Sequence, residues 1–465
     1  MPALSAPIDG IEYSLLLIYP NSSAVLCSMG PDKAPRLPRL WIPTDVRVTA
    51  HLCNAVSTAW GLQGVVLDYL HSEIDGSRCA VVELFSEDLP ASLQPVSLEH
   101  VREDDLSPRQ RSSLLSLLFG KAESPLSRVG WIYEAIRWVE ETSGEKISSI
   151  RQIEQFNAGG QFSLLRFPMQ NGQSHWLKAT GEPNIHEQPL TSFLSKLCPD
   201  HIPEVLDVKT KWNAWIARGQ RTYPAFPSGD LDRLEALRYA VVAMAKIQLR
   251  SIGYHNELFA KGAFDQRPDI LRSNSSALFE CIREAMDRQT STKAARIGNA
   301  RLHDLRRIFD EVCDFIATLR IPPMVLHGDL NPGNMLYADG HCQFIDWCET
   351  HVGHPLVSLQ HLLLLNRPEN ARLKTSWDAE LTDCYRTVMT EFLRQNVFDR
   401  AITFMPFLAA ASSLYGRGDW FDSLAFLPPQ RLARIRTLAR CMDRAAHELQ
   451  DLGISPHSRI SVGGA

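Results

Sequence analysis

The stretch Val325–Asn334, with the sequence VLHGDLNPGN, decides the fold of the larger part of this chain, together with the sequence FIDW of Phe344–Trp347. The two stretches place two acids and an amide, Asp329, Asn334 and Asp346, in a short unit of strand, loop and hairpin. Such a set of oxygen-bearing side chains is typical of metal-assisted phosphoryl transfer.

The spacing of this unit predicts how its side chains meet. Asp339 and Gly340 separate two short apolar runs, and an Asp-Gly pair in that position favours a two-residue hairpin turn. With these turn residues Asn334 faces Ile345, so Asp346 returns beside the end of the loop. The first acid of the loop lies five residues before Asn334. We therefore expect the three polar groups to converge.

The chemistry of phosphoryl transfer suggests a role for each residue. The reaction needs metal ions that neutralise the phosphates and a base that holds the acceptor hydroxyl in line. Carboxylate and amide oxygens suit Mg²⁺, so Asn334 and Asp346 are the candidate metal ligands. Asp329 is the candidate base, and His327 is expected to brace the loop. Asp and Asn in turns also cap backbone N–H groups, but the combined spacing favours the catalytic interpretation.

The stretches His327–Asn334 and Ile345–Trp347 resemble the catalytic segment of the aminoglycoside phosphotransferase and choline kinase group, which are small-molecule kinases with a protein-kinase-like fold. The resemblance implies Asp329 as catalytic base and Asn334 and Asp346 as magnesium ligands. It is closest over about residues 322–360 and more diffuse over about residues 147–450.

One departure from the family pattern follows the second acid. Many members continue with Gly-Asp-Pro and then another Asp, whereas this chain reads GHPLVSL over residues 353–359. His354 and Ser358 stand where acids often stand. This weakens any transfer of acceptor contacts from the best-known members.

Upstream, residues 150–179 read as a three-stranded antiparallel meander, with strands at 150–156, 161–169 and 174–179. We interpret it as the small lobe that covers a nucleotide. Gly159 and Gly160, in its first turn, would let backbone N–H groups approach phosphate oxygens. Two adjacent glycines alone more often indicate a plain hairpin turn.

A lysine on the third strand of a kinase-like small lobe pairs with the nucleotide phosphates and is held by a glutamate on the next helix. Lys178, between apolar neighbours, is the candidate lysine. Its partner is Glu187 or, as the alternative, Glu182. Pro189 leaves the choice open, because a helix that starts at this proline would place Glu187 just outside.

The predicted domains follow from these patterns. We expect an accessory α+β domain over residues 1–100, a helical connector over 101–146, the small nucleotide-binding lobe over 147–220, a helical catalytic and acceptor-binding lobe over 221–452, and a flexible tail over 453–465. The fold class is therefore α+β: a two-lobed protein-kinase-like fold, with a small antiparallel sheet lobe and a large mostly helical lobe, preceded by a small α+β domain.

The accessory domain weakly resembles a Nudix domain in its order of strands, helix and strands, with Trp60-Gly61-Leu62 at the end of the helix. A Nudix helix presents several glutamates to a divalent metal, and residues 51–60 contain none. We interpret the domain as a degenerate, accessory module. An unrelated α+β domain is the alternative.

Composition bounds the function. The chain has 465 residues, 45% of them hydrophobic and 22% charged, which is enough for two or three cores of an ordinary soluble protein. Its 10 cysteines include no C-x-x-C pair, and no secretory or transmembrane segment is evident, so we expect a cytoplasmic protein. A net charge of -5 predicts no nucleic-acid partner and no membrane anchor. The oligomeric state is left open.

The expected function is an ATP- and Mg²⁺-dependent phosphotransferase that moves the γ-phosphate to a hydroxyl of a small-molecule acceptor, aminoglycoside-, choline- or sugar-like. The alternative is a catalytically weak kinase-fold protein that binds nucleotide and regulates. A protein kinase is disfavoured, because Asp346 is followed by Trp347-Cys348 in place of Phe-Gly.

Overall fold

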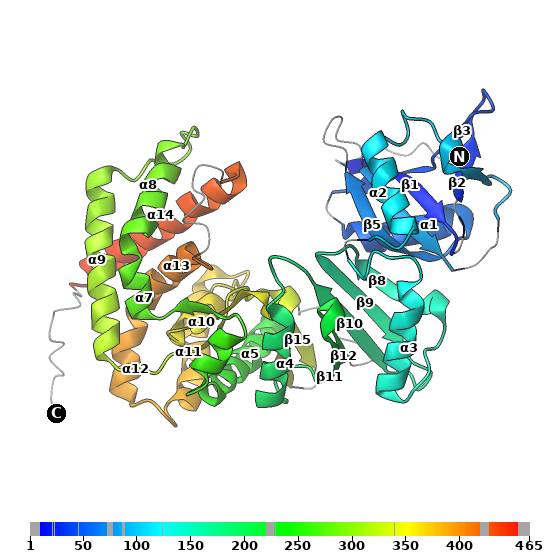
Figure 1. Cartoon of the computed structure of the whole chain (residues 1–465). Coiled ribbons are helices and arrows are strands. Elements are labelled where there is room, and N and C mark those ends of the chain that lie inside the picture. The colour runs from blue at the N-terminus through cyan, green and yellow to red at the C-terminus, as the bar shows by residue number, and fades with distance from the viewer. Residues whose placement is uncertain are drawn as a thin grey trace. The chain divides into compact units, whose positions relative to one another are not determined.

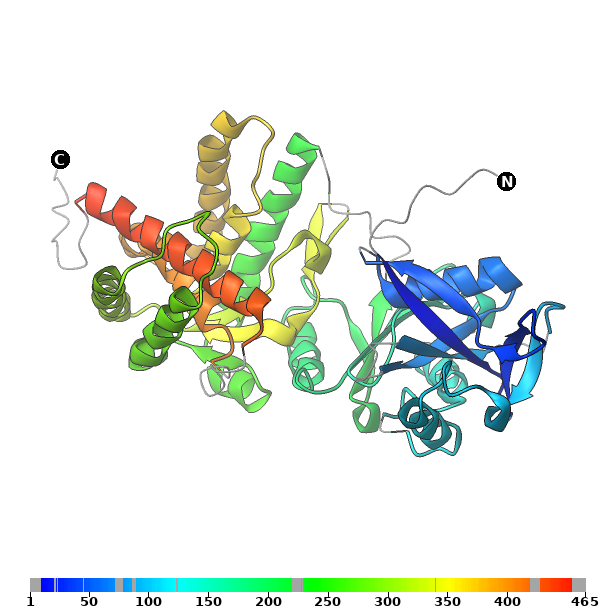
Figure 2. The same cartoon turned by 90° about the horizontal axis from the view of Figure 1, so that it is seen from above.

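The computed structural model describes residues 10–453, with the exception of residues 21, 23, 45, 72–77, 86–88, 123, 220–226, 228, 339 and 419–426. Of the expected tail, residues 454–465 lie outside the described part. The chain forms two compact units, which Figures 1 and 2 show in two views. Unit 1 comprises residues 1–188 and 204–222, and unit 2 comprises residues 189–203 and 223–465.

Unit 1 begins with a mixed sheet in which β1 pairs with β6 in parallel and the other pairs are antiparallel. The helix α1 (Val48–Trp60) belongs to this N-terminal module. The strands are β1 (Gly10–Ile18), β2 (Ala24–Met29), β3 (Pro35–Arg36), β4 (Arg39–Pro43), β5 (Gly64–His71), β6 (Arg78–Leu84) and β7 (Gln94–Ser97).

The strand β1 is apolar on both of its faces because both faces are covered. Leu15 and Leu17 point to one core, which contains Leu52 of α1, whereas Leu16 and Ile18 point to another. Successive side chains of a strand alternate between the faces of the sheet, so a run of four apolar residues serves two cores.

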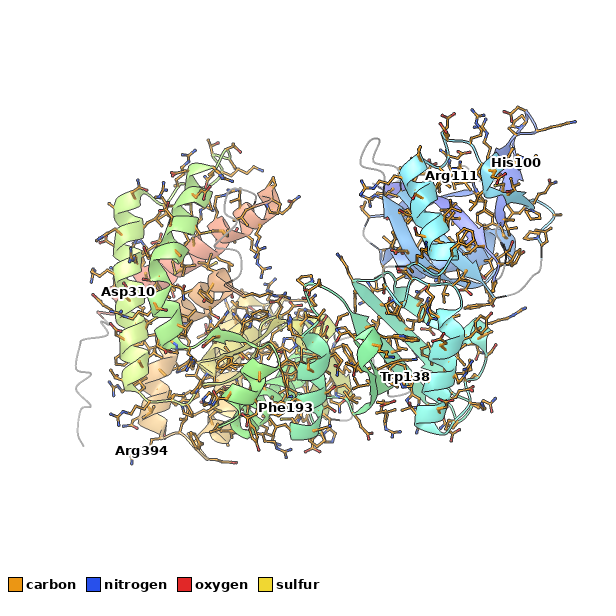
Figure 3. The ribbon with its side chains drawn as sticks, viewed as in Figure 1. His100, Arg111, Trp138, Phe193, Asp310 and Arg394 are labelled. Carbon is orange, nitrogen blue, oxygen red and sulfur yellow. The ribbon has the colours of Figure 1, made fainter. Side chains whose placement is uncertain are left out.

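The second part of unit 1 is the small lobe, a five-stranded antiparallel sheet in the order β11-β12-β10-β9-β8. Its connector supplies α2 (Pro108–Leu118) and α3 (Trp131–Ser143). Trp138 on α3, labelled in Figure 3, donates its indole N–H to Asp207 of β11 at 2.6 Å. The strands are β8 (Glu154–Asn157), β9 (Phe162–Pro168), β10 (Ser174–Thr180), β11 (Val205–Lys209) and β12 (Ala214–Gly219).

The N-terminal module and the small lobe share one hydrophobic core. One contiguous cluster contains Leu16 of β1, Val81 of β6, Trp131 of α3 and Leu177 of β10. The side chain of Gln155 strengthens this join, because it accepts from the N–H of Val66 (2.8 Å) and donates to its carbonyl (2.9 Å). The division of unit 1 into an accessory domain, a connector and a lobe remains a prediction.

Unit 2 is mostly helical, and α8, α9 and α14 lie side by side in it (Figures 1 and 2). The helix α4 starts in unit 1 and continues into unit 2. The helices are α4 (Glu187–Leu197), α5 (Asp230–Arg250), α6 (His255–Ala260), α7 (Pro268–Ser273), α8 (Ser275–Asp287), α9 (Asn299–Thr318), α10 (Leu356–Leu363), α11 (Lys374–Met389), α12 (Gln395–Ile402), α13 (Met405–Tyr415) and α14 (Pro429–Asp451).

Two small sheets carry the polar unit of the sequence. One has the order β13-β17-β14, with β13 (Phe264–Gln266) parallel and β14 (Met324–His327) antiparallel to β17 (Thr350–Gly353). The other is the hairpin of β15 (Met335–Ala338) and β16 (His341–Phe344). The expected α+β class, with a small antiparallel sheet and a mostly helical part, is confirmed by these elements.

Two local predictions were wrong. The first strand of the small lobe starts at Glu154 and not at Ile150, because Ile150–Gln152 form a turn of 3-10 helix whose start is capped by the Ser149 side chain. The helical spacing of Leu231, Leu234 and Leu237 in the sequence predicts that all three face the core, but Leu231, in the first turn of α5, is 75% exposed.

Among the described residues, no single helix has both the length and the apolar composition needed to span a membrane. The bent pair of α12 and α13, at 64°, reaches these limits when the two helices are taken together.

Candidate active site

The strand β14 delivers the catalytic-type loop, and His327 fixes that loop to the hairpin. His327 is buried, and its Nδ1 accepts the N–H of Asp329 at 3.2 Å. The ring proton is therefore on Nε2, which donates to the carbonyl of Ile345 at 2.8 Å. The imidazole thus links the backbone N–H of Asp329 to the backbone carbonyl of Ile345, the residue just before Asp346.

Asp329 and Asn334 meet at the two ends of the loop. The side-chain amide of Asn334, itself 8% exposed, donates to the backbone carbonyl of Asp329 at 2.9 Å and to its Oδ2 at 3.1 Å. These two bonds orient the exposed carboxylate of Asp329. Because the amide nitrogen makes both bonds, the Oδ1 of Asn334 keeps its capacity as an acceptor or a metal ligand.

The hairpin has the register that the sequence predicts. Met335 pairs with Phe344, and the N–H of Ile345 donates to the carbonyl of Asn334 at 3.1 Å. Asp346 follows directly, in the left-handed conformation with φ 66° and ψ 64°. Such a conformation is uncommon for a residue with a side chain and is often found where a site requires it.

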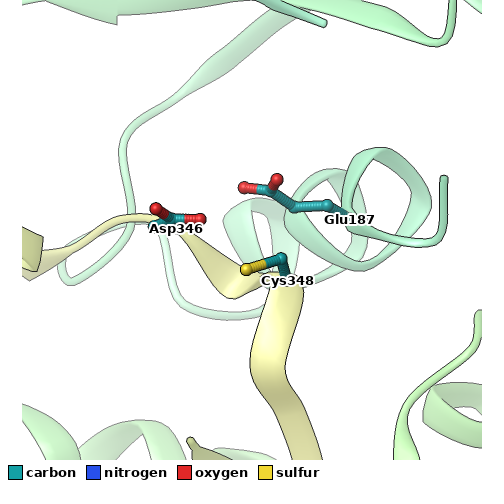
Figure 4. A group of neighbouring side chains, drawn as sticks. All are labelled: Glu187, Asp346 and Cys348. Carbon is teal, nitrogen blue, oxygen red and sulfur yellow. The ribbon is translucent and has the colours of Figure 1, made fainter. Parts of the chain in front are cut away.

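The oxygen-only donor set of Asn334 and Asp346 fits Mg²⁺, which prefers carboxylate and carbonyl ligands and completes its shell with water and phosphate. Figure 4 draws Asp346 and Cys348 on the segment that leaves β16, and Glu187 in the first turn of α4.

In unit 1, Lys178 of β10 forms an ion pair with Glu187, with Nζ and Oε1 2.5 Å apart. Both side chains are largely buried, at 13% and 2% exposure, and the ammonium group also lies 5.1 Å from the centre of the Phe162 ring. Glu187 is the first residue of α4 and Pro189 the third, so the proline lies in the first turn, where it is tolerated. Of the two candidate partners, Glu187 is the one in contact with Lys178.

The turn between β8 and β9 holds Gly159 and Gly160. Gly159 has φ 104°, which favours glycine. A Cβ at Gly160 would lie 2.7 Å from the Cβ of Ser124 in the connector. Close packing therefore accounts for the second glycine, and a phosphate-binding role for the pair remains a prediction.

His354 and Ser358, which replace the usual acids, are buried in a neutral environment. Both ring nitrogens of His354 and the Oγ of Ser358 have no hydrogen-bond partner among the described residues. Burial lowers the pKa of His354 to about 3, so its ring is neutral at physiological pH. Unit 2 therefore carries no charge at either position.

Sequence reasoning missed Glu349 and Arg417. The guanidinium of Arg417 makes a two-pronged ion pair with Glu349, 2.6 Å at its closest. The residues are 68 positions apart, and no local pattern in either segment indicates the pairing.

Comparison with known families then identifies the class. A profile of the phosphotransferase enzyme family (APH) matches residues 265–389, which include β14, the loop, the hairpin and α10. Over this segment the chain is similar to the phosphotransferase enzyme family. The expected relationship to aminoglycoside phosphotransferases and choline kinases is thereby confirmed, as is the enzyme class, a phosphotransferase with an alcohol group as acceptor. The match leaves the Nudix-like resemblance of residues 1–100 a prediction.

Solved structures of small-molecule kinases are similar at low identity. A macrolide 2'-phosphotransferase from Brachybacterium faecium is 15% identical, with a TM-score of 0.42, and the match covers 66% of this chain and 97% of that one. A putative fructosamine-3-kinase from Thermobifida fusca is 16% identical, with a TM-score of 0.40, and the match covers 66% of this chain and 98% of that one. An ethanolamine kinase from Plasmodium vivax is 14% identical, with a TM-score of 0.42, and the match covers 64% of this chain and 84% of that one. Likenesses at this level say nothing about the acceptor. Curated protein sequences gave no significant match.

Proposed function

We propose that this protein transfers the γ-phosphoryl group of ATP to a hydroxyl of a small molecule, with Asp329 as the base. The observation that supports this most is the hydrogen-bonded pair of Asp329 and Asn334 on a loop whose hairpin leads into Asp346. A base, an amide and a second acid in this order form the working parts of a phosphotransferase.

Each residue then has a task. Asp329 accepts the proton of the acceptor hydroxyl, and Asn334 holds the carboxylate in place. His327 keeps the loop and the hairpin together through its two hydrogen bonds. Asn334 and Asp346 would hold Mg²⁺, which when bound neutralises charge on the phosphates.

On the nucleotide side, Lys178 would contact the phosphates. Glu187 orients its ammonium group through an ion pair in a largely buried environment. Gly159 and Gly160 would leave the backbone of their turn accessible to phosphate oxygens. The acceptor is proposed only as a class, a hydroxyl-bearing small molecule, since the loop handles the phosphate and the helical part selects the alcohol.

The first test is Asp329→Asn. We expect the variant to lose phosphoryl transfer by about 10²-fold or more, because the base is gone, while its ADP affinity stays the same. ATP consumption should be followed against a library of hydroxyl-bearing metabolites and antibiotics. Asp287→Asn, which changes an exposed ion-paired acid on α8, is the control. Full turnover in Asp329→Asn would exclude the proposed base.

The second test addresses the metal. Asp346→Asn suits this purpose because asparagine tolerates the left-handed conformation at this position. We expect the affinity for ADP to fall in the presence of Mg²⁺ and to be unchanged in EDTA, both measured by calorimetry. Equal loss under both conditions would argue against a metal ligand. If the native protein binds nucleotide but consumes no ATP with any acceptor, the regulatory alternative is favoured.

A further inference from the structure

Arg417, just after α13, is anchored to the three-stranded sheet of unit 2 by its side chain and its backbone neighbours. Its guanidinium forks onto Glu349 and lies 5.1 Å from the centre of the Phe264 ring. The carbonyl of Gly416 accepts from the side chain of Gln266 at 2.7 Å. The side chain of Arg417 is 13% exposed and that of Glu349 is 31% exposed, so the pair is partly buried.

The sheet brings this arginine to the edge that carries the catalytic loop. The strand β14 ends at His327 where β17 begins at Thr350, because the two run antiparallel. The strand β13 is parallel to β17, so Phe264, at its start, lies at the same edge. The N–H of Gly328 donates to the carbonyl of Glu349 at 2.8 Å across that edge. The partner of Arg417 is thus bonded to the residue next to Asp329.

The same glutamate ends the turn that begins with the candidate metal ligand. Trp347–Glu349 form one turn of 3-10 helix, and Asp346 is its N-cap. The Oγ of Thr350 donates to the carbonyl of Trp347, which holds the end of this turn from the other side. A single turn therefore connects Asp346 to the Gly328 N–H.

We propose that Arg417 is a positioning residue for phosphoryl transfer. By clamping Glu349 it fixes one short turn, and that turn sets both the carboxylate of Asp346 and the loop of Asp329. The inference rests on the proposed function and adds a residue to it. A planar fork that makes two parallel bonds is specific to arginine, so lysine at this position is expected to restore the charge but not the geometry.

The experiment compares Arg417→Ala and Arg417→Lys with the native full-length protein. The control is Arg301→Ala, because Arg301 makes an ion pair of similar burial with Asp443, 2.7 Å long, between α9 and α14 of the same unit. The probes are Mg²⁺-ADP and ADP in EDTA for binding, and Mg²⁺-ATP hydrolysis without acceptor for turnover.

We expect Arg417→Ala to lower kcat for hydrolysis by about 10- to 100-fold, since displacements near 1 Å at a reacting centre have effects of this size. The gain in ADP affinity on adding Mg²⁺ should fall several-fold, while the affinity in EDTA is unchanged. Arg417→Lys should be intermediate. Arg301→Ala should leave kcat for hydrolysis and both ADP affinities unchanged, although its thermal stability should fall as much as that of Arg417→Ala.

A second pair of variants guards against simple misfolding. Glu349→Gln keeps the size of the side chain and removes the negative charge of the ion pair. The double variant Glu349→Gln/Arg417→Ala should have the same kcat as Arg417→Ala alone, because the two residues act as a unit. Unchanged kcat and an unchanged Mg²⁺ effect in Arg417→Ala would overturn the inference and leave the proposed function standing. Failure of the native protein to bind ADP under either condition would overturn both.

Discussion

Gly328 has no room for a side chain, and its substitution by alanine should displace the loop that carries Asp329. A Cβ built on Gly328 lies 2.6 Å from the carbonyl oxygen of Glu349 and 2.7 Å from Nδ1 of His351, and it also meets Cε1 of that ring. Ordinary contacts of a Cβ are longer than 3.4 Å. Gly328→Ala therefore requires a shift of about 1 Å or more, either of a buried ring or of the loop itself.

The size of the effect follows from this geometry. His351 is 4% exposed and cannot swing into solvent, and the Glu349 carbonyl is fixed by its bond from the loop. Overpacking of this kind costs about 1–3 kcal/mol of stability. Because the displaced backbone carries Asp329, we expect kcat to fall by about 10²-fold, with a smaller change in nucleotide affinity.

Urea unfolding and ATP turnover measure the two effects. Gly298→Ala is the control, since a Cβ at that helix-start position has no atom within 4 Å. We expect that change to cost less than about 1 kcal/mol and to leave turnover intact. His351→Ala in the Gly328→Ala background should recover part of the stability. A Gly328→Ala protein as stable and active as the native one would refute the reasoning.

Three further predictions concern unit 1. Gln155→Ala should cost about 2–5 kcal/mol in urea unfolding, because it leaves the N–H and carbonyl of Val66 without their partners; a loss below about 0.5 kcal/mol would contradict this. Burial raises the pKa of Glu83 to about 7 from an ordinary value near 4.5, so the folded state binds the proton more tightly than the unfolded state. The resulting contribution to the free energy of unfolding is fully present below about pH 4.5. It is lost as the pH rises to 7, by up to about 3 kcal/mol. Unfolding of Glu83→Gln should lack that slope, and an equal slope in both proteins would assign it to other groups. Lys178→Met should weaken ADP binding and cost about 3–5 kcal/mol, since it leaves the buried carboxylate of Glu187 without this cation. The double variant with Glu187→Gln should regain stability but not ADP affinity, and recovery of both would remove the phosphate role.

The local parts of the candidate site could be predicted from the sequence. The β15-β16 hairpin has the register expected from its loop length, which puts Ile345 opposite Asn334. Asp339 of the predicted turn lies outside the described residues. The lysine of β10 was predicted from its strand and the kinase-like arrangement, whereas its partner was left open between Glu187 and Glu182 because the helix start was uncertain. The structure supplies that start by placing Pro189 in the first turn.

Contacts between distant segments could not be predicted, because no periodicity links them. The ion pair of Arg417 and Glu349 depends on contacts between α13 and the sheet, such as the hydrogen bonds of Ser412 with Gln266 of β13. The sequence also gives no sign that a Cβ at the second glycine of the β8-β9 turn would lie 2.7 Å from the Cβ of Ser124 in the connector. A single sequence states which residues are small or charged, but not which remote chain approaches them.

The shared core of unit 1 changes how the N-terminal module should be viewed. Along β10, Leu177 and Ala179 face the core that also contains Leu16 and Val81 of the N-terminal sheet, and Lys178 faces the opposite side. The face of β10 opposite Lys178, the candidate phosphate ligand, therefore packs in a core that the N-terminal module shares. An accessory domain on a tether would leave that surface of β10 to the small lobe alone. Here the module completes the core against which β10 packs, and Lys178 lies on the opposite face of that strand.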